Sequence, residues 1–417
     1  MASAFMTELS AQDRRAYQAN IWKLYLLHFL MQFQLWWSIW VLYLQDMRGF
    51  SLTQIAVLEA LFWGTAVVAQ LPTGALADRF GRRTSLTLGA ALTTVAVLVF
   101  GLATTYWIAL ASYLVWALAI AFLSGADYAV LFESLKALGR EREFQGVAGR
   151  LGAVFSFAAL AGGLLGAPIA AATNLSFPIL LSAAIAAPGF LVALSLREPA
   201  LPEGEMRLAY RSLLRESTRT AARTPTVRSM LVLSALFSAM TFGPMLFMQP
   251  FLTEHGVEIA LVGFLQTPVR VAGIAGALAA AWATARLGTR GIFLATPLLM
   301  TAGYLLLGTW DAVYAFAAFP LVTLVNALVV PPATDYLNQR IPNNQRATVL
   351  SLRMMLTSLG AALLTPGLGV AADAISLRGM FLVSAIVTGA TLSVAAGLWL
   401  RADLREGTEE ETKVAVT

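Results

Sequence analysis

The chain has 417 residues, of which 58% are hydrophobic and only 12% charged, and its mean hydropathy is +0.72. A soluble domain carries roughly 25% charged residues, so the composition excludes a water-soluble enzyme and indicates lipid as the solvent. The absence of Cys and the presence of only two His exclude disulfides and thiolate or His-rich metal sites, and the net charge of +5 must be read through its distribution.

The apolar residues form twelve long segments. Residues 1–20 are polar and lack the apolar stretch of a signal peptide, so the first segment is expected to stay in the protein. Each segment provides the ~20 residues that a bilayer crossing requires. We expect helices at about 21–45, 52–76, 84–104, 107–135, 146–172, 176–196, 228–252, 258–285, 291–309, 312–338, 346–372 and 378–400. The sequence therefore predicts an all-α membrane protein with twelve transmembrane helices.

The basic residues indicate the orientation of these helices. If the N-terminus lies in the cytoplasm, the cytoplasmic segments hold 23 of the 28 Lys and Arg residues. Only Arg48 and Arg378 fall in the opposite segments, and the other three lie inside helices. Because cytoplasmic loops carry an excess of Lys and Arg, we expect a multi-pass protein of the cytoplasmic (inner) membrane with both termini in the cytoplasm.

A long polar stretch divides the helices into two sets of six. We expect an N-terminal six-helix bundle at 1–196, a cytoplasmic linker at 197–227, and a C-terminal six-helix bundle with a cytoplasmic tail at 228–417. In the linker, three leucines lie among three arginines, which predicts a short amphipathic helix on the cytoplasmic membrane surface. These residues are Leu208, Leu213, Leu214, Arg211, Arg215 and Arg219. A binding site for a regulatory partner is the alternative.

The two sets of helices also repeat each other in sequence. Three features recur in the same order at separations of 203 to 208 residues. These pairs are Asp127-Tyr128 with Asp335-Tyr336, Gly81-Arg82-Arg83 with Gly288-Thr289-Arg290, and Arg150 with Arg353. Together they favour a duplicated six-helix unit, and hence two pseudo-symmetric bundles.

One motif connects the chain with a known family. The segment Gly74–Leu86, GALADRFGRRTSL, follows the second predicted helix. It resembles the signature loop of the major facilitator superfamily, G-x-L-a-D-r-x-G-r-r/k-x-x-l, at every defined position. The resemblance implies the major facilitator fold, secondary transport and a monomer. It also implies a conformational latch, in which Asp78 docks on the opposite half, and we expect the N-terminus of the eleventh helix near Arg346 to receive it. The latch residues would be Gly74, Asp78, Arg79, Gly81, Arg82 and Arg83.

Two glycines of this loop have a physical reading that does not depend on the family. Gly74 and Gly81 are expected to permit a close approach of helices and a tight turn. The second copy of the loop has Ala285 in the place of Asp78, so a symmetric second latch is not expected.

The fifth predicted helix carries a second resemblance. Gly162, Gly163, Gly166 and Pro168 resemble the G-x-x-x-G-P-x-x-G-G pattern of antiporters in this family, although Ala167 separates the last Gly from Pro. The pattern favours antiport. The alternative is that small residues only allow close packing between the halves.

Ionisable residues inside the membrane are costly and need a reason. They fall on helices 1, 2, 4, 5, 8, 10 and 11, whereas helices 3, 6, 9 and 12, which the resemblance places on the lipid side, carry none in their interiors. Five are predicted to form an inner gate of ion pairs: Asp127, Glu133, Arg150, Asp335 and Arg353. Asp373, near the outer end of its helix, is expected to be solvated.

Three residues are candidates for proton coupling: Glu59, Asp127 and His28. Glu59 is expected ~12 Å below the outer surface, where desolvation would favour its protonated form. Arg270 is expected near the middle of the membrane, facing water, an acid or an anionic ligand group. The alternatives are a buried polar clamp for Glu59 and Arg270, and a hydrogen-bonded structural histidine for His28.

The first helix supplies most of the predicted substrate cavity, because apolar walls with a few amides suit an amphiphilic or aromatic organic molecule. Gly243-Pro244 and Pro331-Pro332 are expected to break helices 7 and 10 near this cavity. The candidate lining residues are Gln32, Phe33, Gln34, Trp36, Trp37, Glu59 and Arg270.

The leading functional hypothesis is a secondary transporter that exports a small organic molecule in exchange for protons, as a drug/proton antiporter does. Its partners would be the substrate, protons and membrane lipids, with no nucleic acid and no cofactor. The alternative is proton-coupled uptake or facilitated transport of a nutrient or organic anion. A channel or a membrane-embedded enzyme is a remote alternative, since the chain has neither a G-x-x-x-x-G-K-[ST] loop nor a Gly-x-Ser-x-Gly elbow.

Overall fold

The computed structural model describes residues 10–198, 216, 218–343 and 345–416, and within these ranges it is all-helical, with no strand. Ten segments of these residues are long and apolar enough to cross a membrane. One of them, α12 (Ile259–Thr309), is interrupted at Gly288, whose φ of 69° and ψ of 165° are not helical, and so contains two crossings. The expected all-α membrane fold is confirmed.

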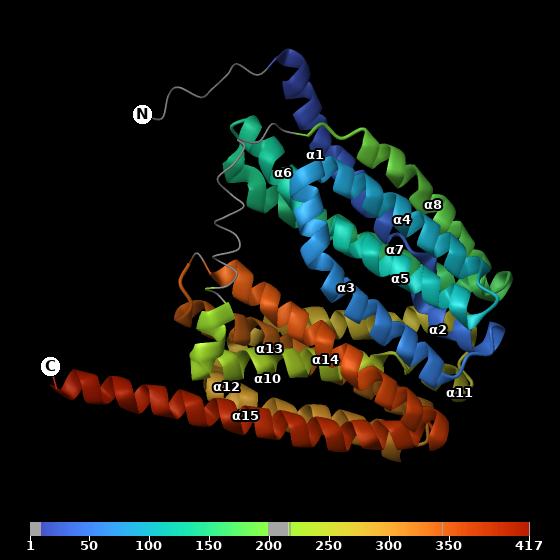
Figure 1. Ribbon diagram of the computed structural model, residues 1–417. Helices are drawn as coiled ribbons and strands as arrows, with labels where there is room; N and C mark the ends of the chain where they lie inside the picture. Colours follow the sequence, from blue (N-terminus) through green and yellow to red (C-terminus); the bar gives the residue numbers. More distant parts are fainter. Residues whose placement is uncertain (1–9, 199–215, 217, 344, 417) are drawn as a thin grey trace. The chain divides into compact units, whose positions relative to one another are not determined.

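The first half of the chain begins with a broken segment and continues with longer rods. Its elements can be followed from blue to green in Figure 1. They are α1 (Ala11–Gln32), the 3-10 helix η1 (Leu35–Ser38), α2 (Trp40–Leu42), the π-helix η2 (Tyr43–Met47), α3 (Leu52–Phe80), α4 (Arg82–Leu102), α5 (Tyr106–Leu123), α6 (Ala126–Ala137), the 3-10 helix η3 (Glu141–Glu143), α7 (Phe144–Ala172) and α8 (Phe177–Leu194).

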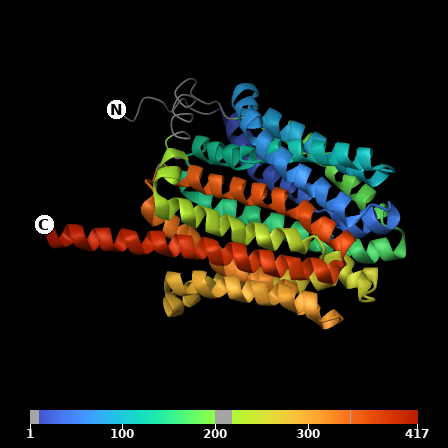
Figure 2. The same cartoon turned by 60° about the horizontal axis from the view of Figure 1, so that its bottom comes forward.

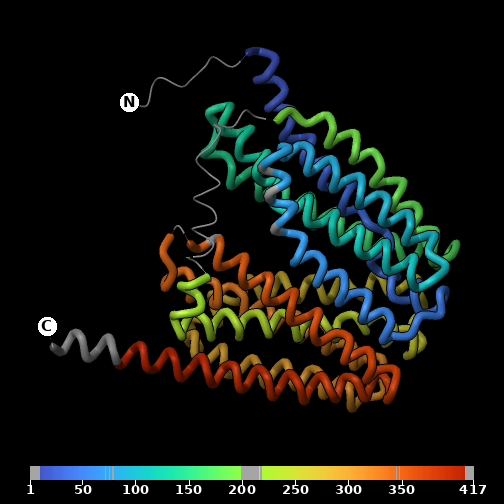
Figure 3. Tube along the Cα trace, in the orientation of Figure 1, coloured from blue at the N-terminus to red at the C-terminus, as the bar shows by residue number. Residues whose placement is uncertain are grey.

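The second half ends in the 40-residue helix α15, a single rod in Figure 2 that can also be followed along the Cα trace in Figure 3. The elements of this half are α10 (Pro225–Met245), α11 (Met248–Glu254), α12, the 3-10 helix η4 (Val313–Ala317), α13 (Ala318–Arg340), α14 (Arg346–Ala374) and α15 (Leu377–Val416).

The chain forms two compact units that are not simple halves of the sequence. Unit 1 contains Met1–Phe50, Leu61–Pro202 and Glu258–Phe264, and unit 2 contains Ser51–Ala60, Glu203–Val257 and Leu265–Thr417. The first residues of α3 therefore belong to unit 2 and the rest of α3 to unit 1. The expected division at the linker stays a prediction, and residues 199–215, where the amphipathic helix was expected, lie outside the described ranges.

The first crossing is broken, which corrects the expectation of one helix over 21–45. The α-helix ends at Gln32, and the chain makes a 3-10 turn before it resumes at Trp40. Two glycines of α7 face this break. A Cβ at Gly162 would lie 2.8 Å from the Gln34 carbonyl oxygen, and one at Gly166 would overlap the Leu35 carbonyl oxygen. The small residues of the fifth crossing thus make room for irregular backbone of the first.

A second break interrupts the fourth crossing, which was expected to be one helix over 107–135. The helix α5 ends at Leu123, and Gly125, with φ of 80°, begins the new helix α6. Only Gly adopts this left-handed conformation without strain. The break puts Asp127 in the first turn of α6, where the positive end of the helix dipole favours a negative charge.

The two proline-containing pairs, Gly243-Pro244 and Pro331-Pro332, behave differently. As expected, the seventh crossing breaks next to Gly243-Pro244, because α10 ends at Met245 and α11 starts at Met248. The prediction for Pro331-Pro332 is wrong, since α13 runs without interruption from Ala318 to Arg340. A proline removes one backbone hydrogen bond of a helix, and a long helix can accommodate this loss by bending locally.

Acidic residues at the ends of the sixth and twelfth crossings bind the corresponding loops in the two halves. In the first half, the Glu198 carboxylate accepts a hydrogen bond from the backbone N–H of Arg82, directly after Gly81, whose φ is 94°. In the second half, Asp403 of α15 accepts from Arg290 at 2.8 Å. Both acids hold the turn between the second and third crossing of their half, which agrees with a duplicated unit.

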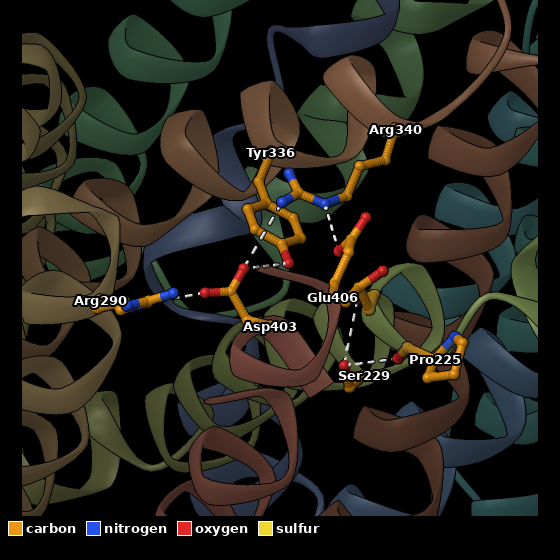
Figure 4. A network of polar contacts seen from close by, with 8 residues as sticks. Pro225, Ser229, Arg290, Tyr336, Arg340, Asp403 and Glu406 are labelled. Carbon is orange, nitrogen blue, oxygen red and sulfur yellow. Dashed lines mark hydrogen bonds and ion pairs between the residues drawn. The ribbon is translucent and has the colours of Figure 1, made fainter. Parts of the chain in front are cut away.

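In unit 2 the contact of Asp403 belongs to a larger network of polar contacts, which Figure 4 shows. Asp403 also accepts a hydrogen bond from the Tyr336 hydroxyl at 2.8 Å, and Arg340 pairs with Glu406 at 3.1 Å. The guanidinium of Arg340 stacks over the Tyr336 ring at 3.7 Å. These contacts fix the extension of α15 beyond its apolar part to the end of α13.

Candidate functional site

The break in the fourth crossing brings two ionisable residues of unit 1 together. The Nε2 atom of His28 on α1 lies 2.8 Å from an oxygen of Asp127 on α6, and their side chains are only 13% and 14% exposed. The other Asp127 oxygen accepts a hydrogen bond from the backbone N–H of Tyr128 at 2.7 Å. The rings of Tyr128 and Phe155 flank the imidazole. We call this pair the His28–Asp127 dyad.

The five residues expected to form an inner gate have different partners from those expected. Asp127 pairs with His28, and Arg150 is exposed on α7. Glu133 pairs with Arg82 at 2.6 Å. Asp335 is exposed and accepts from Gln339, and the Nε and Nη1 atoms of Arg353 are buried without a partner in the described part of the chain. Their role as a gate stays a prediction.

The signature loop has the turn that the sequence indicated. Gly81 adopts a positive φ of 94°, and Arg82 links the start of α4 to Glu133 at the end of α6. Gly74 differs from the expectation of a close helix approach, because a Cβ there would meet no atom within 4 Å. The side chain of Asp78 lies outside the described residues.

The remaining latch residues are arginines. Arg79 and Arg83 are exposed, and Arg79 lies over the ring of Phe80. At the expected receiving end, the start of α14, the Nε atom of Arg346 is buried and has no hydrogen-bond partner among the described residues. The docking of Asp78 on this helix stays a prediction.

The broken first crossing presents aromatic side chains in unit 1. Trp36 stacks on Trp37 at 4.8 Å, and Trp116 of α5 meets Trp36 edge-on at 4.9 Å. Phe33 stacks on Phe29 at 5.2 Å. Trp37, Trp116 and Phe33 remain half-buried, so their rings are partly accessible.

Two residues expected to line the cavity have structural roles instead. Gln34 is 3% exposed, donates to the Met31 carbonyl at 2.8 Å and accepts from the Trp36 indole at 2.7 Å. Trp36 is itself buried. These bonds satisfy groups that the break removes from regular helix. Gln32, Phe33 and Trp37 keep the accessibility that contact with a substrate requires.

The cavity candidates of unit 2 differ in exposure. Glu59 is 7% exposed and makes an interaction within the protein. Arg270 of α12 is exposed, and no hydrogen bond or ion pair of this side chain occurs among the residues that the structure describes. On the neighbouring α13, Asn326 accepts from Ser238 of α10 at 3.3 Å.

Asp373 is not simply solvated, which corrects the expectation from its position. Its two carboxylate oxygens accept hydrogen bonds from the backbone N–H groups of Leu52 and Thr53, at 3.0 and 2.8 Å. Leu52 is the first residue of α3, so Asp373 of α14 serves as a cap for another helix. Next to it, a Cβ at Gly369 would lie 2.7 Å from that of Ala56. Both ends of this contact belong to unit 2.

Some of these contacts had a signal in the sequence and others had none. The Ser124-Gly125 pair, which only Ala126 separates from Asp127, indicates a helix break, and this break would have placed Asp127 at a helix start. Trp116 and Asn326 lie in the middle of the fourth and tenth crossings, and nothing in their spacing indicates which neighbour they meet. The same holds for Asp373 and α3, which are 320 residues apart.

The fold matches known membrane transporters over nearly its full length. The nucleoside transporter NupG superimposes with a TM-score of 0.71 at 14% identity, over 92% of this chain and 98% of that chain. A bacterial homolog of the human lysosomal transporter Spinster, in an inward-facing and unoccupied conformation, gives 0.68 at 18% identity, over 94% and 98%. A POT family transporter in complex with a thioalcohol-conjugated peptide gives 0.68 at 12%, over 93% and 96%. A comparison with curated proteins found no match.

The sequence itself matches one family. The description of that family is Major Facilitator Superfamily, and the match covers residues 24–365 and, in a second overlapping alignment, 230–415. Together with the all-helical fold and the transporter structures, this indicates a membrane transporter rather than an enzyme. The chain belongs to the Major Facilitator Superfamily.

Proposed function

We propose that the protein is a proton-coupled exporter of small organic molecules in the cytoplasmic membrane, and that the His28–Asp127 dyad carries the proton. Alternating access to the two sides of the membrane would load and unload the substrate. The observation on which this proposal depends is the 2.8 Å contact between the imidazole and the carboxylate.

The chemistry of the dyad suits a proton carrier. Imidazole is the one side chain that, unperturbed, changes charge between about pH 5 and 8. With one bound proton the dyad is an ion pair of zero net charge, and without it the dyad carries one negative charge. A negative charge in an apolar surrounding is costly. Release is therefore favoured where the side chains reach water, and their 13% and 14% exposure leaves such a path.

The other charged groups near the dyad are few. The helix α1 packs against α6, α7 and α8, and α8 has no titratable residue. On α1 itself, Lys23 donates to the Ser195 carbonyl and Tyr25 to the Val147 carbonyl. On α6 lie Tyr128, Lys136 and Glu133, which is paired with Arg82, and on α7 lies the exposed Arg150.

The second half supplies an internal comparison. Asp335 corresponds to Asp127 in the repeated sequence, yet it is exposed and bonds only to Gln339 among the described residues. No His lies near the position in the second half that corresponds to His28. Because the second bundle forms without such a dyad, the fold does not require it, and this supports a functional role for the dyad in the first.

Support for export comes from the resemblance of the fifth crossing to antiporters. The structure gives Gly162 and Gly166 a local reason, the break in the first crossing, while Gly163 approaches Gly263 of α12. Coupled uptake is the alternative, and the similar structures include a nucleoside transporter and a POT family transporter in complex with a peptide conjugate. The direction of the proton gradient that drives accumulation separates the two.

The test uses proteoliposomes and three probes of one shape: 2-naphthalenesulfonate, 2-naphthalenesulfonamide and N,N,N-trimethyl-2-naphthylammonium. We expect at least one probe to accumulate when the lumen is acidic, because an antiporter then exchanges lumenal protons for probe whatever its orientation. His28→Gln and Asp127→Asn should each abolish this accumulation but keep exchange between equal probe concentrations. The matched change Asp335→Asn should keep most of the accumulation.

Three outcomes would contradict the proposal. Accumulation only with an acidic exterior would show symport, and hence uptake. Full gradient-driven accumulation in His28→Gln or Asp127→Asn would remove the dyad as the proton carrier. A wild-type protein that accumulates none of the probes under either gradient would contradict export of this class of molecule.

We also propose that the loop Gly74–Leu86 acts as the conformational latch. Asp78→Asn is expected to reduce the rate of probe exchange about 10-fold, because the charge that docks on α14 is lost, while probe affinity stays within about 2-fold. Exchange rates in proteoliposomes and affinities by calorimetry give the two values. Glu143→Gln, which removes an exposed cytoplasmic acid paired with Arg140, is the control. An Asp78→Asn protein as fast as this control would refute the latch.

A further inference from the structure

A surface of unit 2 is rich in hydrogen-bond donors and lacks carboxylates. The helices α12 and α13 contact each other closely: a Cβ at Gly273 would lie 3.3 Å from Thr323, and one at Gly276 would lie 2.9 Å from the Cβ of Ala327. The contact positions advance together along the two helices, so the helices are parallel. Arg270 lies one turn before Gly273, so along the helix axis it is offset by ~5 Å from the level of Thr323 and by ~10 Å from that of Asn326.

The polar groups of this surface have unused donors. The hydroxyl oxygens of Thr267 and Thr323 are buried and have no hydrogen-bond partner among the described residues. Asn326 uses its carbonyl oxygen to accept from Ser238, which leaves the two amide N–H donors. Buried polar atoms are nearly always paired in proteins, so unpaired ones call for an explanation.

The charge of Arg270 also needs an explanation. In the second half, residues 225–253, 259–310, 312–334 and 341–372 contain no Asp or Glu. No ion pair of Arg270 occurs in the described ranges, although it lies twelve residues from Glu258 and sixteen from Arg286, near the centre of its crossing. A guanidinium at that depth facing lipid would cost several kcal/mol, so water or an anionic group is its expected neighbour.

We propose that Arg270, Thr323 and Asn326 form a binding subsite for the anionic group of the transported molecule, a sulfonate, carboxylate or phosphate. Guanidinium binds such planar or tetrahedral oxyanions through two parallel hydrogen bonds, and the hydroxyl and amide donors bind the remaining oxygens. Thr267, one turn before Arg270, adds a further hydroxyl. The proposal rests on the transport function proposed above and specifies its substrate as an organic anion.

Glu59 is the carboxylate that has to be considered as a partner of Arg270. It lies on the α3 segment of the same unit, is buried and already makes an interaction within the protein. If Glu59 neutralised Arg270, the surface would carry no net charge and would not select anions. The affinity of Glu59→Gln for an anion distinguishes the two arrangements.

The test measures binding to the purified full-length protein by calorimetry, without any gradient. We expect 2-naphthalenesulfonate to bind at least 10-fold more tightly than the neutral sulfonamide and the trimethylammonium probe. Arg270→Gln should lose about 10-fold or more of the sulfonate affinity, the range for a hydrogen bond to a charged group. Arg270→Lys should restore part of it, since the charge stays but the planar fork is lost.

Three further variants keep the test decisive even if the Arg270 variants fail to fold. Thr323→Val, which has nearly the same shape, should weaken sulfonate binding about 3- to 10-fold and leave the sulfonamide unchanged. Arg286→Gln, on the same helix but over the ring of Trp282, should have no effect. Glu59→Gln should keep the preference for the sulfonate.

The subsite is refuted if Arg270→Gln keeps the full sulfonate preference, if the wild type has no preference for the sulfonate, or if the preference arises only in Glu59→Gln. These results are separate from those on the dyad. A sulfonate preference that depends on Arg270, without any gradient-driven accumulation, would keep the subsite and contradict the exporter. Accumulation that depends on His28 but not on Arg270 would keep the exporter and contradict the subsite.

Discussion

A methyl group added at Gly166 is expected to destabilise the protein strongly. The new Cβ would overlap the carbonyl oxygen of Leu35, which is backbone and cannot move as a flexible side chain can. Overpacking of this kind costs about 1–3 kcal/mol, and here it also disturbs a break whose polar groups have fixed partners. The Leu35 N–H, for example, donates to the Ser182 hydroxyl at 2.9 Å.

Gly152→Ala is the matched control for Gly166→Ala. Both residues lie on α7, but a Cβ at Gly152 would meet no atom within 4 Å. Replacing Gly by Ala in an open helical position stabilises by about 0.5–1 kcal/mol, so the two changes should shift the melting temperature in opposite directions. Tryptophan fluorescence during heating in detergent measures both shifts. Equal shifts would mean that α7 does not pack on the break as described.

A second large effect is expected at Asp373. Its carboxylate accepts two backbone N–H groups at the start of α3, and Gly369 brings the two helices into contact. The loss of a helix cap costs about 0.5–2 kcal/mol. Asp373→Ala should therefore favour separation of α14 from the start of α3 by a factor of up to about 30. Asp373→Asn, which keeps an acceptor oxygen, should have a smaller effect.

The natural sequence has no Cys, so a single introduced Cys reports this separation without a background. Leu52 is 6% exposed, and in Leu52→Cys a membrane-impermeant maleimide should react slowly. Adding Asp373→Ala should raise the labelling rate about 5- to 30-fold, provided that the contact between α14 and α3 opens and closes faster than the maleimide reacts. Asp311→Ala removes an exposed acid paired with Arg378 and serves as the control. Equal rates in Asp373→Ala and Asp311→Ala would contradict a closing role for Asp373.

The sequence by itself determined the fold class and the family. Twelve apolar segments of bilayer length, the distribution of Lys and Arg, and the segment Gly74–Leu86 are local patterns, and each has a physical meaning without knowledge of any contact. The residues that occupy special backbone conformations could also be read locally. Gly81 and Gly288 follow corresponding crossings, and both adopt a positive φ in the structure.

The tertiary structure alone decided the partners of the charged and amide side chains. Asp127 was expected in an inner gate of ion pairs but meets His28, and Gln34 turns inward to Trp36. A hydrogen bond depends on distances of a few tenths of an ångström, and periodicity along one helix does not fix its rotation against another.

The breaks in the first and fourth crossings also depend on the tertiary structure. The irregular backbone from Phe33 to Ile39 is stable because Gly162 and Gly166, on a helix more than 120 residues away, leave room for it. A helical propensity sums over neighbours in sequence, whereas the free energy of a break depends on neighbours in space. For this reason the all-α membrane fold was evident from the sequence, while the geometry that brings His28 to Asp127 was not.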